Sequence, residues 1–394
     1  MAPDLMQIER DVNVWLTAQR TAAPADLKDY YSKFADFYDR KLWHQLTVSI
    51  EKFAALPAAV PFFLALYDNF IVDFEKKINP ISLVKFLIQV AHQMKDPKAA
   101  LSFLSAQSEK LKEWGVGSKE AYVLAVMETA HYRVVTGDLE GCKIAMEESE
   151  KLLDELPATE TVISAAFYRV SADYYNYKMA YQQYYHNALL FLSSVNIDDL
   201  SIQEKQERAY NLSMSALLGE SLYNFSELLM HPILDSLKNT SMEWLRILLF
   251  QFNTGDMDGF EKTSRSGEFL KLPILVNTLA FLRQKLCLMT LIEAVFKRSK
   301  EMRGKMTFSE ISRETRVSLE EVEHLVMKAL SLGLIRGKID QVDSVVIVTW
   351  VQSRVLDKSQ IKTIHDRLDG WSNKVLEQVT GLEQQESVQS LIVQ

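Results

Sequence analysis

Glycine and proline are scarce in this sequence, at 13 and 9 of 394 residues. Because both residues punctuate turns and loops, their scarcity disfavours an all-β or loop-rich architecture. Leucine, alanine, glutamate, lysine and glutamine, which favour helices, are abundant instead. A chain of this length also buries a sizeable core without disulfides or metal ions. The composition therefore favours a large, mainly α-helical protein.

Cysteine is nearly absent. The two cysteines, Cys142 and Cys287, lie in apolar, helix-like stretches, and neither a disulfide framework nor a zinc-ligand spacing can be drawn from them. We therefore expect buried thiols in a protein from a reducing compartment.

Recognisable catalytic and cofactor motifs are missing too. The seven histidines are scattered, without His-x-His, His-Glu-x-x-His or Cys-x-x-Cys spacing, and no Gly-x-Ser-x-Gly elbow occurs. Residues 115–119 are too short for a phosphate loop, and we interpret them as a helix–helix connection in which Ser118 caps the second helix. Acidic runs such as Glu147, Glu148 and Glu150 are typical of a solvated helix face. We expect no enzymatic activity, no catalytic or metal-binding residues and no cofactor.

The net charge of −8 lowers the expectation of nucleic-acid binding, which depends on lysine and arginine. Residues 1–20 carry Asp4, Glu9, Arg10 and Asp11, which is unlike a secretory signal. Residues 179–197 lack charged side chains but hold too many Gln, Asn, Ser and His residues for a membrane span. We expect a soluble protein of the cytoplasm and nucleus.

A hexapeptide pattern divides the central part into helix pairs. A helical spacing over 120–135 is followed by Thr-Gly-Asp-Leu-Glu-Gly, in which Gly137 can end one helix in a left-handed conformation and Asp138 can cap the next. The next helix is predicted to end at Pro157. The pattern returns at 254–259, with breaks near Tyr177 and Gly219 between the copies. Steps of roughly 40 residues predict a helical-repeat solenoid. The alternative is an irregular helical domain.

A similar series of helices is predicted toward the N-terminus, with breaks at Asn79-Pro80 and Asp96-Pro97. Helices are predicted over 30–38, 42–56, 62–77, 82–94 and 99–114.

The pattern changes near residue 290. Helices over 291–301, 309–316 and 319–332 are predicted, with Ser309 capping the second helix and Gly333 ending the third. A short strand at 306–308 and two longer ones at 334–339 and 345–350 complete the pattern of a winged helix. The poor alternation of residues 345–348 predicts a strand that is covered on both faces.

The last helix is predicted over 357–383. Its apolar residues follow steps of three, four and seven, which define a heptad seam: Ile361, Ile364, Leu368, Trp371, Val375 and Leu382. A helix with one apolar stripe needs a partner, either the body of this protein or other chains.

These patterns predict a mainly α fold: a right-handed helical-repeat solenoid, a small α+β winged-helix module and a long C-terminal helix. We expect domains at 1–180 and 181–352, the latter divided into a helical part, 181–289, and the winged helix, 290–352. Residues 353–394 would form the C-terminal helix and tail.

A winged helix often reads DNA with its third helix. Here that helix carries Glu320, Glu321 and Glu323 against Lys328 alone, and phosphates would repel the carboxylates. A winged helix that binds proteins is the better interpretation, since a free wing edge can accept a strand from a neighbour.

Several long segments resemble one known family. They are residues 41–47 (KLWHQLT), 79–84 (NPISLV), 217–220 (LLGE), 227–232 (ELLMHP), 321–330 (EVEHLVMKAL) and 349–357 (TWVQSRVLD). Together with the order of solenoid, winged helix and C-terminal helix, they resemble the PCI-domain proteins. These are scaffold subunits of the proteasome lid, the COP9 signalosome and translation initiation factor 3. The match is closest to a non-ATPase lid subunit and runs from about residue 40 to 371, so residues 181–352 would form the PCI domain.

This resemblance implies a non-catalytic scaffold that supports lid assembly and ubiquitin-dependent degradation. The wing would contact a neighbouring subunit through Leu334, Ile335, Ile339, Val345, Ile347 and Trp350. The seam of the last helix would enter a bundle with other subunits. The implied partners are other PCI and lid subunits in a hetero-oligomer, without nucleic acid or membrane. The alternatives are a subunit of a sister PCI complex or a winged-helix nucleic-acid-binding protein.

Overall fold

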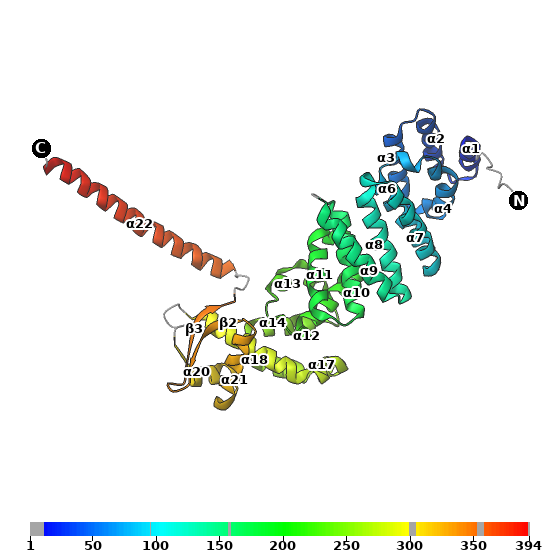
Figure 1. Cartoon of the computed structure of the whole chain (residues 1–394). Helices are drawn as coiled ribbons and strands as arrows, with labels where there is room; N and C mark the ends of the chain where they lie inside the picture. Colours follow the sequence, from blue (N-terminus) through cyan, green and yellow to red (C-terminus); the bar gives the residue numbers. More distant parts are fainter. Residues whose placement is uncertain (1–11, 95, 157–158, 299–304, 353–357, 393–394) are drawn as a thin grey trace. The chain divides into compact units, whose positions relative to one another are not determined.

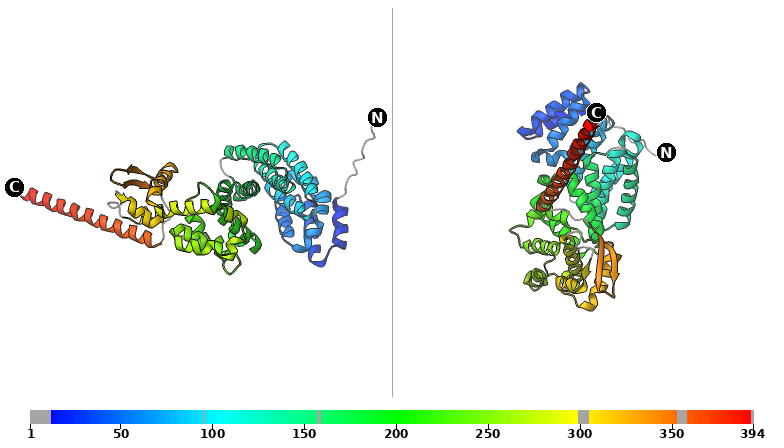
Figure 2. Two further views of the ribbon diagram at one scale, coloured as in Figure 1. Left: turned by 90° about the horizontal axis from the view of Figure 1, so that it is seen from below. Right: turned by 90° about the vertical axis from the view of Figure 1, so that its left-hand side faces the viewer.

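The computed structural model describes residues 12–94, 96–156, 159–298, 305–352 and 358–392. The chain divides into two compact units, Met1–Glu220 and Ser221–Gln394. The sequence-based boundary at residue 180 stays a prediction. Both units are helical, and a small sheet lies in the second (Figures 1 and 2).

The first unit is a stack of helices in which alternate members touch. Helix α8 packs against its chain neighbours α7 and α9 and also against α6 and α10 (Figure 1). This arrangement is that of stacked helix pairs, as predicted. The helices are α1 (Val12–Ala22), α2 (Ala25–Asp39), α3 (Trp43–Ala54), α6 (Pro80–Gln93), α7 (Pro97–Glu113), α8 (Lys119–Thr136), α9 (Leu139–Glu155), α10 (Thr161–Tyr177), α11 (Tyr181–Ser194) and α12 (Ile202–Leu218).

The prediction of one continuous helix over 62–77 is wrong. The chain there forms short pieces: a 3₁₀ turn (Pro57–Phe62), α4 (Phe63–Leu66), a π turn (Tyr67–Ile71), α5 (Val72–Phe74) and a 3₁₀ turn (Glu75–Lys77). On length and composition alone, Pro57–Lys77 is one described segment that is apolar enough to cross a bilayer. Its aromatic residues Phe63, Tyr67, Phe70 and Phe74 are instead buried in the core of the first unit, where the rings of Phe34 and Phe70 are 5.8 Å apart. Val60, Leu64 and Val72 of the same segment are exposed.

The two hexapeptides form the predicted junctions. Gly137 and Gly255 adopt left-handed φ angles of 87° and 72°, which end α8 and α14 (Glu243–Thr254). Each following aspartate then caps the next helix: Asp138 accepts from the Gly141 amide, and Asp256 from the Gly259 amide, both at 3.0 Å. The α7–α8 connection differs from prediction, because Ser118 does not cap α8 with its side chain. Its hydroxyl donates backward to the Leu111 carbonyl at 2.9 Å.

The second unit begins with a helical layer and continues into the winged helix. Its elements are α13 (Ser226–Met230), a 3₁₀ turn (Pro232–Leu237), α14, α15 (Met257–Ser264), α16 (Gly267–Leu270), α17 (Pro273–Asn277), α18 (Leu279–Lys297), β1 (Met306–Thr307), α20 (Phe308–Thr315), α21 (Leu319–Ser331), β2 (Ile335–Asp340), β3 (Val345–Val351) and α22 (Lys358–Ile392).

The winged helix has the predicted order of elements, with three corrections. Its first helix, α18, begins at Leu279 rather than 291. Helix α20 is capped by Thr307, which forms a capping box with Glu310, so Ser309 is not the cap. Strand β3 lies between β1 and β2 and pairs antiparallel with both. It buries Val346 and Val348 but leaves the opposite face half-exposed, so it is not covered on both faces.

Candidate protein-interaction surfaces

The six wing residues predicted to meet a neighbour divide into two sets. Leu334 and Ile335 are buried, at 3% and 1% exposure, and support the wing from within. Ile339, Val345 and Ile347 are half-buried, and Trp350 is exposed. The outward surface of the wing is therefore formed by the second set.

Strand β2 is an edge strand of the described sheet, because the order is β1-β3-β2. A bulge lies between Arg336 and Gly337. The Arg336 guanidinium lies 4.9 Å from the centre of the Trp350 ring, so a flat aromatic and cationic surface sits beside this edge. An edge strand with such neighbours can accept another chain.

Helix α22 presents an apolar stripe to solvent. Ile361, Ile364, Leu368, Trp371 and Val375 are between 40% and 67% exposed. Every residue of this helix whose exposure is described is exposed. Leu376 and Val379, which the heptad prediction passed over, widen the stripe. The prediction that the seam needs a partner, either the body of this protein or other chains, stays a prediction. Leu382, the last residue of the predicted seam, lies in α22, but its exposure is not described.

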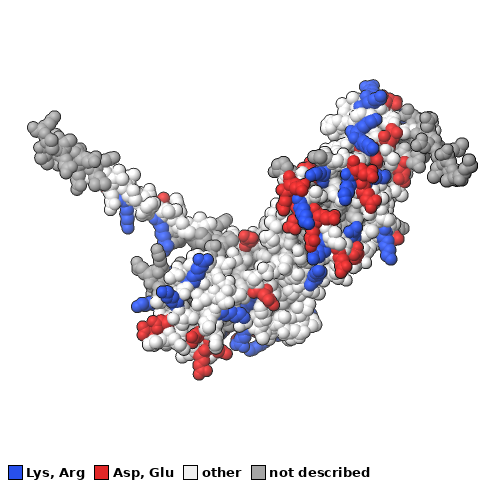
Figure 3. Space-filling model, in the orientation of Figure 1, with Lys and Arg blue, Asp and Glu red and all other residues white. Residues whose placement is uncertain are grey.

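Helix α21 presents acidic side chains at the end that would approach DNA. Glu320 and Glu321 are exposed at its N-terminal end, and Glu323 accepts a hydrogen bond from the Gln341 side chain at 3.1 Å. Lys328 donates to the Gln284 side chain at 2.6 Å. The nearby Arg316 forms a two-pronged ion pair with Asp258, at 2.6 and 2.5 Å, and this pair holds the pKa of Asp258 below its usual value. On the face in Figure 3, basic side chains are interspersed with acidic ones.

The two cysteine thiols lie in the interior of the protein. Both cysteines are buried, and burial raises the pKa of Cys142 to about 11, which keeps the thiol protonated at neutral pH. Burial also raises the pKa of Cys287. Within the described ranges, no three His, Cys, Asp or Glu side chains gather in a group that could hold a metal ion.

Two family models match most of the chain. A model described as PSD13 N-terminal repeats matches residues 30–249, and the PCI domain model matches residues 260–350, which contain the winged helix. In Arabidopsis thaliana, the 26S proteasome non-ATPase regulatory subunit 13 homolog B is 40% identical over 370 residues, covering 92% of this chain and 94% of the relative. The chain belongs to the family of proteasome non-ATPase regulatory subunit 13.

Other members of the subunit 13 family match at similar levels. The probable 26S proteasome regulatory subunit rpn9 of Schizosaccharomyces pombe is 38% identical over 372 residues, covering 94% of this chain and 96% of the relative. A more distant similarity joins the chain to translation initiation factor 3. Subunit M of that factor from Coccidioides immitis is 25% identical over 198 residues, which is 50% of this chain and 42% of the relative. The proteasome assignment of the sequence resemblance is confirmed over its sister-complex alternative.

Proposed function

We propose that this chain is a non-catalytic structural subunit of the proteasome lid, working in lid assembly and ubiquitin-dependent degradation in the cytoplasm and nucleus. Its membership of the subunit 13 family supports the assignment to this complex. The observation that carries the structural role is α22, a 35-residue helix with an exposed apolar stripe. Large apolar surfaces of this kind mark protein interfaces.

The proposed contacts use two surfaces. The edge of β2 with Ile339, Ile347 and Trp350 meets a neighbouring PCI subunit, and the half-buried Val345 lies at the same wing. The seam of α22 enters a bundle with helices of other lid subunits. A non-catalytic role is supported by the missing motifs and the buried, protonated thiols.

The experiment tests the seam with matched alanine variants. Trp371 lies on the stripe, whereas Asn373, two residues along, lies on the opposite side of the helix. Loss of a large aromatic side chain from a desolvated interface costs about 2 kcal/mol or more, which is roughly a thirtyfold loss of affinity. Trp371→Ala should therefore reduce incorporation, and Asn373→Ala should leave it unchanged.

Each variant is expressed with an N-terminal tag, purified from cells and assayed by mass spectrometry and by ATP-stimulated cleavage of a fluorogenic peptide. Recovery of ATPase and lid subunits with the wild type, and their depletion with Trp371→Ala, supports the proposal. Equal recovery of lid subunits with both variants would show that the seam does not contribute to assembly. Recovery of the wild-type chain alone would contradict the scaffold function.

A further inference from the structure

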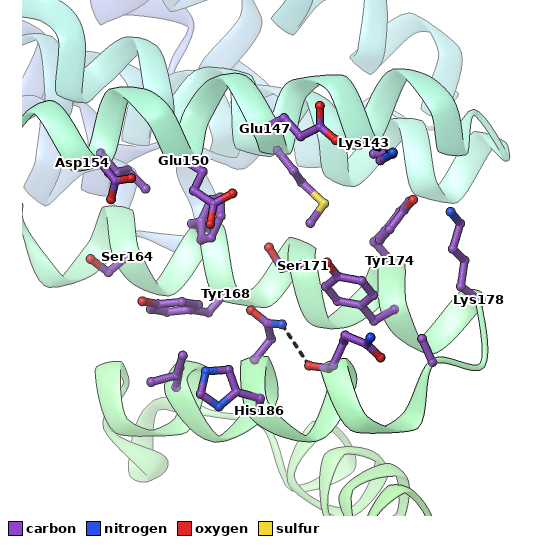
Figure 4. Close-up of a pocket in the computed structure, with 18 of the residues that line it drawn as sticks. Lys143, Glu147, Glu150, Asp154, Ser164, Tyr168, Ser171, Tyr174, Lys178 and His186 are labelled. Atoms are coloured by element: carbon purple, nitrogen blue, oxygen red, sulfur yellow. Dashed lines mark hydrogen bonds and ion pairs between the residues drawn. The ribbon is translucent and has the colours of Figure 1, made fainter. Parts of the chain in front are cut away.

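A groove in the first unit lies between α9 and α11 and is floored by α10 (Figure 4). Its volume is about 630 Å³. One wall runs along α9 from Lys143 to Asp154, which at 1.5 Å per residue is about 16 Å. A strand of about five residues has that length. The groove is thus long enough for a short extended segment of polypeptide.

The charges of the groove are not balanced. Lys143 pairs with Glu147 on the same helix at 3.4 Å, and the Lys178 ammonium lies 4.7 Å from the centre of the Tyr174 ring. Lys143 is therefore paired, whereas Lys178 keeps its positive charge and lies at the opposite end of the groove from Asp154 (Figure 4). Glu150 and Asp154 lie one turn apart on α9, and in the described part of the chain neither forms an ion pair. At the end of the groove that holds Glu150 and Asp154, the unpaired charge is negative.

The floor offers a ring and a hydroxyl to a ligand. In Figure 4, Tyr168 lies on α10 below Glu150 and Asp154, and His186 faces it from α11. Ser171, also on α10, is 1% exposed, and its hydroxyl has no hydrogen-bond partner among the described residues. Buried hydroxyls are ordinarily paired, so this one lacks an acceptor. A backbone carbonyl of a bound segment is an acceptor of the required kind.

We propose that this groove binds an extended segment of a partner polypeptide that carries arginine or lysine between apolar residues. The cation lies between Glu150 and Asp154 and over the Tyr168 ring, while a backbone carbonyl accepts from Ser171. Flanking apolar side chains pack on Met146 and Phe167. A nucleic acid does not fit, because its phosphates would meet the two unpaired carboxylates. The inference is independent of the winged helix and of α22.

The test measures binding of a defined peptide to the full-length chain by fluorescence anisotropy. The probe is fluorescein-labelled Gly-Leu-Arg-Phe-Arg-Leu-Gly, and its counterpart has glutamate in place of arginine. The arginine peptide should bind, and the glutamate peptide should not. Because reversing both charges replaces attraction of the arginine side chains by repulsion, Glu150→Lys/Asp154→Lys should weaken binding about fivefold or more. Ser171→Ala should weaken it about threefold.

The matched control reverses two charges outside the groove, in Glu109→Lys/Glu148→Lys. Both residues are exposed, on α7 and α9, and neither lines the groove. This variant has the same net charge as the groove variant and should bind within twofold of the wild type. Circular dichroism and thermal melting establish that all variants are folded. Equal weakening in both double variants, equal binding of both peptides, or no binding of the arginine peptide at millimolar concentration would each overturn the proposal.

Discussion

A partly buried ion pair joins α8 to α10 in the first unit. The Glu128 side chain is 4% exposed, and its partner Arg169 is 28% exposed. The pair is incompletely satisfied, since the second carboxylate oxygen of Glu128 and the Nε of Arg169 are buried without a hydrogen bond in the described structure. His131 lies beside it, with Nδ1 3.6 Å from a carboxylate oxygen of Asp173. Such a pair contributes little to stability when intact, but removing one partner leaves the other charge buried and unpaired.

We predict that Arg169→Met lowers the free energy of unfolding by about 3 kcal/mol, because Glu128 is left as an unpaired buried carboxylate. The double variant Glu128→Gln/Arg169→Met should recover most of this loss. Urea denaturation of both variants checks the prediction. A double variant no more stable than Arg169→Met would show that the cost comes from packing.

Lys285 is a second buried charge, on α18. It is 1% exposed, and the rings of Tyr223, Phe225 and Phe281 lie with their centres 5.5–5.9 Å from its ammonium nitrogen. Burial lowers the pKa of Lys285 to about 7. The unfolded chain, with an ordinary lysine pKa near 10.4, therefore binds more protons than the folded chain between these two values. Stability must rise with pH across that window and lose this dependence below pH 7.

We expect the free energy of unfolding of the wild type to gain, from this group, up to about 1.4 kcal/mol per pH unit between pH 7.5 and 9.5. Lys285→Met, which keeps a long apolar side chain, should lack this gain. Guanidinium titrations of both proteins at several pH values provide the measurement. Parallel pH profiles would show that Lys285 keeps an ordinary pKa.

At the scale of elements, the two Thr-Gly-Asp junctions have the same backbone conformation in different surroundings. A Cβ added at Gly137 would meet nothing within 4 Å, whereas at Gly255 it would lie 2.9 Å from the Thr290 hydroxyl and 3.0 Å from its Cα. The first glycine is required by its φ angle alone. The second is required also by the close approach of α18.

Gly137→Ala should therefore destabilise by about 1 kcal/mol, the cost of a left-handed alanine. Gly255→Ala should cost more, by about a further 1 to 3 kcal/mol, since the methyl group is forced against a packed backbone. Thermal unfolding of the two variants provides a matched comparison. Equal effects would mean that α18 moves aside.

Most element positions could be predicted because their signals are local. Asn79 and Asp96 precede proline and accept from the Ile81 and Lys98 amides, both at 3.0 Å, as helix punctuation requires. The winged helix and the heptad stripe followed from the same kind of signal. The break in Pro57–Lys77 could not be predicted, since residues 57–67 are apolar at every position and carry no periodicity to locate the turns.

The candidate surfaces were predictable to different extents. Spacing identified the stripe of α22, but it could not separate buried Leu334 from exposed Trp350, because that depends on which face of the wing packs on the helices. The groove was missed for a related reason. Its carboxylate Glu150 was interpreted as part of a solvated helix face, and only the packing of α9 beside α10 and α11 gives it aromatic neighbours.

At the scale of the whole molecule, the chain consists of two compact units. The first holds two buried apolar clusters of its own, one from Val12 to Leu104 and one from Ile81 to Tyr174. A unit with its own core can fold by itself. The second carries the winged helix and the stripe of α22.

We predict that residues 1–220, produced alone, form a helical protein that unfolds cooperatively on heating. Circular dichroism and calorimetry measure this directly. A fragment that melts without a cooperative transition would show that the first unit depends on the second.

The exposed stripe of α22 also affects how long an unassembled copy of this chain survives. A copy without its partners carries in water a row of Ile, Leu, Trp and Val side chains, the kind of surface that chaperones hold and that promotes aggregation. Unassembled copies should therefore be short-lived, and the abundance of this chain should follow that of the chains that cover the helix. Synthesis in excess of those chains would raise its degradation rather than its level.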